Sequence, residues 1–170
     1  MNNIVKISNP MLVGAMALLK KKNSPENRKL FMDELKHAKL LAPAIITPTP
    51  EVDENGNRKV SKDSKVNFPM LSAAEGKRYF TVFTDLGEMK NVKAEGYLTV
   101  LPIDFKVMAG MLKSTDENCA GIVINPYGES VVLNRKFVDS AVGEEKAAEV
   151  QAAETQSDEA KVSDEETQEA

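Results

Sequence analysis

Apolar side chains recur every three or four residues near the start of the chain, and this period predicts two amphipathic helices. The first is expected to begin at residues 8–10, Ser-Asn-Pro, which offer capping side chains and a proline suited to the first helical position. The second is expected to begin at residues 23–26, Asn-Ser-Pro-Glu, where Glu26 suits the helix dipole. Because so few residues separate them, the two helices are predicted to form an αα-hairpin.

Beyond this hairpin, short apolar runs alternate with turn residues, a pattern typical of strands. Gly76, in the bend at residues 74–77, offers the positive φ that a tight turn between two such runs can use. Pro69 cannot donate a ladder hydrogen bond, so its run is expected at an edge or a bulge. Strands are predicted at residues 41–46, 66–71, 78–83, 96–101 and, as a hairpin, within 121–134.

Two further segments carry helix signals. Residues 84–88, Thr-Asp-Leu-Gly-Glu, predict a helix start in which Asp85 caps and Glu88 reaches back to the backbone. This local role is favoured over a catalytic pair of carboxylates. Residues 102–112 carry apolar side chains at helical spacing, with Phe105 and Met108 on the inward face.

A long polar segment, residues 47–64, separates the first two predicted strands. Asn55-Gly56 at its centre is a type I′ turn signal, and pairing across that turn would place Asp53 opposite Arg58. The segment is therefore expected to form a small exposed hairpin or flap.

The segment GIVINPYGESVVLN, residues 121–134, holds two apolar runs around the loop Asn-Pro-Tyr-Gly-Glu. Asparagine, proline and glycine at the first, second and fourth loop positions suit a type I turn, with Gly128 in the left-handed region as a bulge residue. Turn geometry requires neither Tyr127 nor Glu129. These two side chains are therefore the strongest candidates for contacts with another molecule.

The order of elements predicts an α+β fold, in which a mainly antiparallel sheet carries helices on one face behind the αα-hairpin. Residues 1–143 are expected to form one domain. A body of this size buries enough surface to be stable without metals or disulfides.

Charge is unevenly distributed along the chain. Of 22 basic and 26 acidic residues, residues 144–170 hold two lysines and ten acids, so this segment carries −8 and the remainder +4. The segment has no aromatic and few apolar side chains, a composition that cannot offset the entropy of ordering. It is expected to be a disordered acidic tail.

The chain is expected to be a soluble, cytoplasmic protein. A single cysteine, Cys119, excludes an internal disulfide and suits a reducing compartment, and its place in an apolar run predicts a buried, inert thiol. The N-terminus lacks a signal-peptide pattern, and no run approaches the ~20 apolar residues that span a bilayer. No membrane insertion is predicted.

One dense basic run, Lys20-Lys21-Lys22, ends the first predicted helix. Cations there stabilise the last free carbonyls, and no aromatic side chains interleave with them as in a surface that stacks bases. Capping is favoured over phosphate binding, so no nucleic-acid partner is expected.

No set of catalytic groups is visible in the sequence. One histidine, His37, and one cysteine do not supply a zinc site, and nucleophile-elbow and phosphate-loop motifs are absent. A Cys119–His37 pair stays open, although nothing local supports it. The chain is therefore expected to have no catalytic residues, no metal site and no cofactor, and not to be an enzyme.

Three blocks together resemble the N-terminal domain of the SseB family, a bacterial family named for enhanced serine sensitivity. They are NPMLVGAMALLKKKNSPENRKLFMDELKHAKLLAPAI, NFPMLSAAEGKRYFTVFTDLGEM and GIVINPYGES, within residues 9–138. The resemblance implies a bacterial cytoplasmic α+β domain and brings no catalytic residues to carry over. The C-terminal domain of some members is expected to be replaced here by the acidic tail.

Two functions fit these features. The favoured hypothesis is a non-enzymatic interaction or adaptor module whose surface for a protein partner includes residues 125–129, alone or together with the flap at residues 47–64. The alternative is a small-molecule-binding regulator or cryptic enzyme with a pocket near Tyr127 and Glu129. The candidate binding residues are Tyr127, Glu129, Asn125, Asp85 and Glu88.

Overall fold

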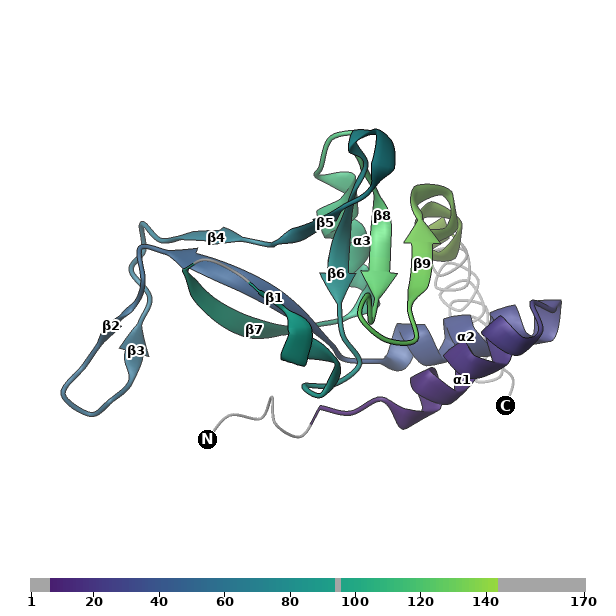
Figure 1. The fold of residues 1–170 in the computed structure, drawn as a ribbon, viewed down its shortest axis with the longest axis horizontal. Helices are drawn as coiled ribbons and strands as arrows, with labels where there is room; N and C mark the ends of the chain where they lie inside the picture. Colours follow the sequence, from purple (N-terminus) through teal and green to yellow (C-terminus); the bar gives the residue numbers. More distant parts are fainter. Residues whose placement is uncertain (1–6, 94–95, 144–170) are drawn as a thin grey trace, which may run out of the picture. The chain divides into compact units, whose positions relative to one another are not determined.

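The computed structural model describes residues 7–93 and 96–143 (Figure 1). Contacts divide the chain into two units, Met1–Arg135 and Lys136–Ala170. In the second unit the structure describes residues 136–143, which are helical. The predicted acidic tail, residues 144–170, lies outside the described residues, and the expected domain boundary at 143 stays a prediction.

The predicted αα-hairpin is present. It consists of α1 (Pro10–Lys21) and α2 (Pro25–His37), each with proline in its first turn. Ser24 caps α2, because its side chain accepts a hydrogen bond from the Asn27 N–H at 3.3 Å. Asn9 has a different role at α1: its side-chain amide donates to the carbonyl of Lys39 at 2.8 Å and to that of Thr84 at 2.7 Å. The N-terminus of α1 is thus tied to distant parts of its own unit.

The first sheet has three antiparallel strands, in the order β4 (Lys65–Asn67), β1 (Leu40–Thr47) and β7 (Tyr97–Ile103). The central strand, β1, is buried along most of its length. Its side chains therefore form much of the core between the sheets.

The second sheet has the order β5 (Met70–Ser72), β6 (Arg78–Val82), β8 (Cys119–Ile124) and β9 (Val131–Asn134). Its outer pairs are antiparallel, but β6 and β8 are parallel. A parallel pair needs a long crossover, and the chain between them contains β7 and α3 (Phe105–Lys113). The α+β class and the mainly antiparallel pairing are confirmed, with two main sheets in place of one.

The two sheets are joined where β1 leaves the αα-hairpin. The Leu41 N–H donates to the Phe83 carbonyl at 2.8 Å, and the Phe83 N–H donates back to Leu41 at 2.9 Å. Both side chains are fully buried and pack with Met89. Phe83, the residue after β6, therefore lies in the core and starts the loop that follows.

The predicted flap contains a hairpin, β2 (Glu51–Val52) with β3 (Arg58–Lys59), and all four residues are exposed (Figure 1). Its turn is one residue longer than predicted. Val52 pairs with Arg58, and the Asp53 N–H donates to the carbonyl of Asn57 at 2.8 Å, so Asp53 does not face Arg58 and three residues, 54–56, form the loop. The predicted type I′ turn is wrong, because Gly56 has a positive φ of 80° but Asn55 does not. The Asp53 carboxylate accepts the N–H groups of Asn55 and Asn57, which holds this longer loop in place.

Two segments, one predicted as a bend and one as a helix, form short 3₁₀ turns. Residues Ala74–Gly76 form η2, where Gly76 has the expected positive φ of 71° and Glu75 also has a φ of 60°. The helix predicted from residue 84 is only η3 (Glu88–Asn91). No helix in the described part of the chain is long and apolar enough to cross a membrane.

Candidate functional site

Two loops meet at the end of the second sheet: residues 84–88, which follow β6, and residues 125–129, which join β8 to β9. Thr84 is fully buried and Asn125 is 2% exposed. The Thr84 N–H donates to Asn125 Oδ1 and Asn125 Nδ2 donates to Thr84 Oγ1, both at 3.0 Å. A buried polar pair satisfied in this way fixes the two loops against each other.

Asn125 also sets the backbone of its loop. Its φ is 50°, a left-handed conformation that asparagine tolerates better than most residues. Its N–H donates to the Val82 carbonyl at 2.9 Å, and its own carbonyl accepts the Gly128 N–H at 3.1 Å. The expected four-residue turn is present. The prediction that Gly128 is the left-handed residue is wrong, because Asn125 takes that conformation.

Gly128 lies against the end of the Glu88 side chain. A Cβ atom there would lie 2.5 Å from Glu88 Oε2 and 3.3 Å from Glu88 Cδ. The Glu88 carboxylate therefore lies directly against the 125–129 loop, and the structure brings this candidate beside the loop that carries Tyr127 and Glu129.

Asp85 is occupied by local hydrogen bonds. Its Oδ1 accepts the N–H groups of Gly87 at 2.7 Å and Glu88 at 3.2 Å, and its Oδ2 accepts the Thr84 hydroxyl at 3.0 Å. Asp85 therefore binds nearby backbone, as predicted, but the prediction that it caps a helix is wrong, because the N-cap of η3 is Gly87, which makes no side-chain capping hydrogen bond. These contacts hold the start of the loop in place.

Tyr127 lies over the end of the core. Its ring stacks on that of Phe83, with centroids 6.2 Å apart and planes inclined by 19°. Phe83 is fully buried, whereas Tyr127 is 48% exposed. One face of the tyrosine ring is therefore supported by the core, and nearly half of the side chain stays open to solvent.

Glu129 pairs with the end of α1. Lys20 Nζ donates to Glu129 Oε2 at 2.6 Å, although the Glu129 side chain remains 79% exposed. The hydrogen bond and the charge of Lys20 lower the pKa of Glu129. The sequence predicted Lys20 as a helix-terminal cation, but did not predict that it reaches this loop.

The five predicted site residues thus divide into two groups. The polar atoms of Asn125 and Asp85 form hydrogen bonds with the backbone and with Thr84. Asn125 was predicted as a surface contact, and its burial corrects that prediction. Tyr127, Glu88 and Glu129 lie around one loop.

Thr84 and Phe83 are the residues that sequence reasoning missed. Thr84 follows a run of strand residues and precedes a capping aspartate, and nothing local shows that its partner stands 41 residues away. For Phe83, its place at the end of an apolar run predicted a strand residue, and this was the only signal in the sequence. Its role as the support of Tyr127 depends on tertiary contacts.

The other reactive side chains do not assemble into a site. His37 is exposed at the end of α2, with Nδ1 2.7 Å from the Asp33 carbonyl, while Cys119 is fully buried in β8, as predicted. Among residues 7–93 and 96–143, no three His, Cys, Asp or Glu side chains gather as a metal ion would require.

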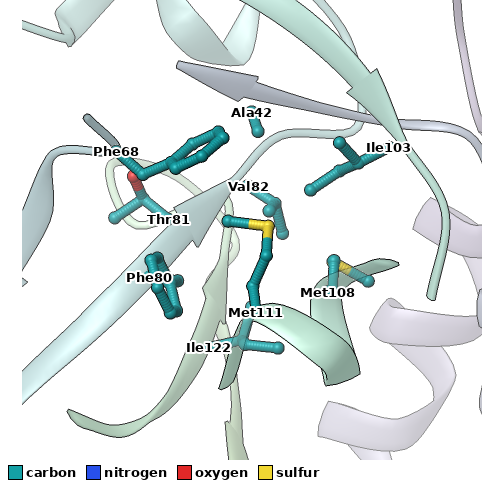
Figure 2. A pocket seen from close by; sticks show the side chains of 9 residues that line it. All are labelled: Ala42, Phe68, Phe80, Thr81, Val82, Ile103, Met108, Met111 and Ile122. Atoms are coloured by element: carbon teal, nitrogen blue, oxygen red, sulfur yellow. The ribbon is translucent and has the colours of Figure 1, made fainter. Parts of the chain in front are cut away.

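One cavity lies between the two sheets and α3 (Figure 2). Its free space is about 10 Å³, near the minimum for one water molecule. Figure 2 shows the Met111 side chain reaching from α3 toward Val82 of β6. Neither Tyr127 nor Glu129 lines it. The lining residues are Ala42, Phe68, Phe80, Thr81, Val82, Ile103, Met108, Met111 and Ile122.

The fold and the site define an α+β domain that displays one supported aromatic side chain on a rigid loop. The chain belongs to the SseB family: the family model described as the SseB protein N-terminal domain matches residues 12–140, more than half of the chain. No curated protein and no solved structure matches it.

Proposed function

We propose that this protein is a non-enzymatic interaction module of the cytoplasm, which binds a protein partner through Tyr127 and the carboxylates beside it. The observation that carries the proposal is the stacking of Tyr127, 48% exposed, on the fully buried Phe83. A tyrosine held in this way loses little conformational entropy on binding and offers both an apolar face and a hydroxyl, which is why tyrosine is enriched at interface hot spots.

The surroundings support a protein partner over a substrate. The polar groups of Thr84, Asn125 and Asp85 are engaged with each other and with backbone, so they stiffen the loop and serve as structure. The Glu88 carboxylate lies against Gly128, next to Tyr127 in the chain, and adds negative charge there, while the exposed Glu129 is paired with Lys20. The fitting partner surface offers an apolar side chain to the ring and a basic group to these carboxylates.

The test is a crosslinking pull-down of tagged full-length protein from its native cells. Tyr127→Ala and Glu129→Ala should each reduce capture of a partner that the wild type retains, and Tyr127→Ala is expected to have the larger effect because Glu129 is exposed and paired. Circular dichroism would show that each variant is folded.

Val132→Ala is the matched control, since Val132 is an apolar side chain of the neighbouring strand with 57% exposure. It should leave the partner list unchanged. Partner recovery that is the same for wild type, Tyr127→Ala and Val132→Ala would refute the proposal.

A further inference from the structure

The first sheet ends on one side in a long strand with an open edge. β7 (Tyr97–Ile103) pairs with β1 along its whole length, and no other strand in the part of the chain that the structure describes pairs with it. The backbone N–H and C=O groups that point away from β1 are therefore a template for one further strand.

The sequence of β7 does little to protect this edge. The strand contains no charged residue, and Pro102 is its one proline. Residues 97–101 are half-buried, so side chains on both faces of the strand are available to a neighbour. Natural edge strands are normally blunted by charges or bulges, or are covered by another segment. An apolar strand of this kind is therefore expected to be covered.

The chain just before α1 lies close to β7. Ile7, the first described residue, is half-buried and packs against the cluster of Leu41, Phe83 and Met89. Val100, in the middle of β7, packs against the same cluster. Residues 1–6, which lie outside the described residues, therefore join the described chain beside the middle of β7.

The direction of this approach is also defined. The Asn9 side-chain amide donates to the Lys39 carbonyl at 2.8 Å, and the next residue, Leu40, pairs with Ile103 at the end of β7. From Asn9 back to Ile7 the chain thus leads from the end of β7 toward its middle. In Figure 1 the described residues before α1 run from the helix toward the first sheet. Continued on this line, the preceding residues reach the start of β7, since six extended residues span about 20 Å.

We propose that residues 3–6 form a fourth strand of the first sheet, parallel to β7 along its free edge. Two β-branched side chains, Ile4 and Val5, suit a strand. Because side chains alternate and Ile7 faces the cluster, Val5 lies on the cluster face beside Leu98, and Ile4 lies on the opposite face. Each face of β7 thus receives one apolar side chain.

Tethering favours this segment over a second copy or a separate peptide. The packing of Ile7 holds residues 3–6 beside the edge, so pairing is an intramolecular step with an effective concentration of about millimolar. A strand from another molecule would have to displace them. This contact is independent of the surface around Tyr127.

Hydrogen exchange of the full-length chain, followed by NMR, tests the pairing. The amides of β7 that point away from β1 should be protected in the wild type, and removal of residues 2–6 should speed their exchange by about tenfold or more while the central strand β8 is unchanged. Equal exchange in both chains overturns the proposal. Protection that appears only as protein concentration rises would mean that a second copy covers the edge, which also overturns it.

Proline variants test the strand at constant chain length. In a strand beside β7, the N–H of either Ile4 or Val5 points to the neighbour. One of Ile4→Pro and Val5→Pro should therefore raise the exchange of the β7 amides as the truncation does. Asn2→Pro, outside the pairing, is the matched control and should behave like the wild type. Three variants that all exchange like the wild type contradict the strand.

Cysteine crosslinking tests the direction. Val5→Cys combined with Leu98→Cys should form a disulfide within one chain on mild oxidation, because the two positions neighbour each other on one face. Val5→Cys combined with Pro102→Cys should not, since a parallel strand leads away from that end of β7. The natural Cys119 is fully buried, so the unmodified chain is the background control. Efficient linking to position 102 in place of position 98 would reverse the strand and overturn the proposal.

Discussion

At the scale of single residues, the Thr84–Asn125 pair holds the site together. Both side chains are buried, and each supplies hydrogen bonds that the other needs. The stacking of Tyr127 on Phe83 depends on this pair, because Phe83 directly precedes Thr84 in the chain and Tyr127 stands two residues after Asn125.

Asn125→Ala should destabilise the protein by about 3 kcal/mol, because it leaves the buried N–H and hydroxyl of Thr84 without this partner. Alanine also tolerates the positive φ at this position less well than asparagine does. Asn125→Gly, which suits that φ, should be about 1 kcal/mol less damaging. Urea unfolding monitored by circular dichroism measures both. A loss below about 0.5 kcal/mol for Asn125→Ala would contradict this account.

The sequence identified part of this site. Turn preferences separated Tyr127 and Glu129 from the residues that only shape the loop, and capping chemistry assigned Asp85 to the backbone. It could not identify Thr84 as the buried partner of Asn125 or Lys20 as the partner of Glu129. Both pairings join residues far apart in the chain, and the sequence around each residue does not indicate its partner.

At the scale of elements, α3 shows how a local cap places a helix. Asp104 is its N-cap: Oδ1 accepts the Val107 N–H at 3.0 Å, and Oδ2 accepts from Lys39 Nζ at 3.2 Å. Asp104→Ala should cost about 1 kcal/mol, mostly from the lost cap because the ion pair is exposed. Thermal unfolding of Asp104→Ala beside Asp104→Asn measures this, and Asp104→Asn should retain most of the stability.

The same cap makes a prediction about pH. The Val107 N–H, and then Lys39, lower the pKa of Asp104 below its ordinary value of 3.8. A lowered carboxyl pKa contributes stability that is fully present above the ordinary value and is lost as pH falls through the lowered one. The stability difference between wild type and Asp104→Ala should therefore be constant from pH 5 to 7 and shrink below about pH 4. A difference that grows in acid would contradict this.

Elements with local signals were predictable, and pairings between distant ones were not. Proline and a capping residue marked the starts of α1 and α2. The parallel pairing of β6 with β8 was missed, because alternation of apolar residues does not report strand direction. After Asp85 only a 3₁₀ turn forms, with Gly87 as its N-cap, where a full helix was expected, since the sequence after Asn91 lacks a continuing helical stripe.

At the scale of the whole molecule, the αα-hairpin both covers the core and supports the candidate site. Its inner face closes the core, and its Lys20 reaches the 125–129 loop. The resemblance drawn from three sequence blocks is confirmed at this scale by the family match over residues 12–140.

The most direct test of the central claim is site-specific photo-crosslinking in native cells. A photoreactive phenylalanine analogue placed at position 127 should crosslink to a defined protein partner, and that product should fall sharply when Glu88→Ala and Glu129→Ala are combined in the same chain. The same analogue at position 132, in place of an equally accessible valine, should not give that product. The absence of a specific product at position 127, or the same products at both positions, would contradict the assignment of Tyr127 as the contact.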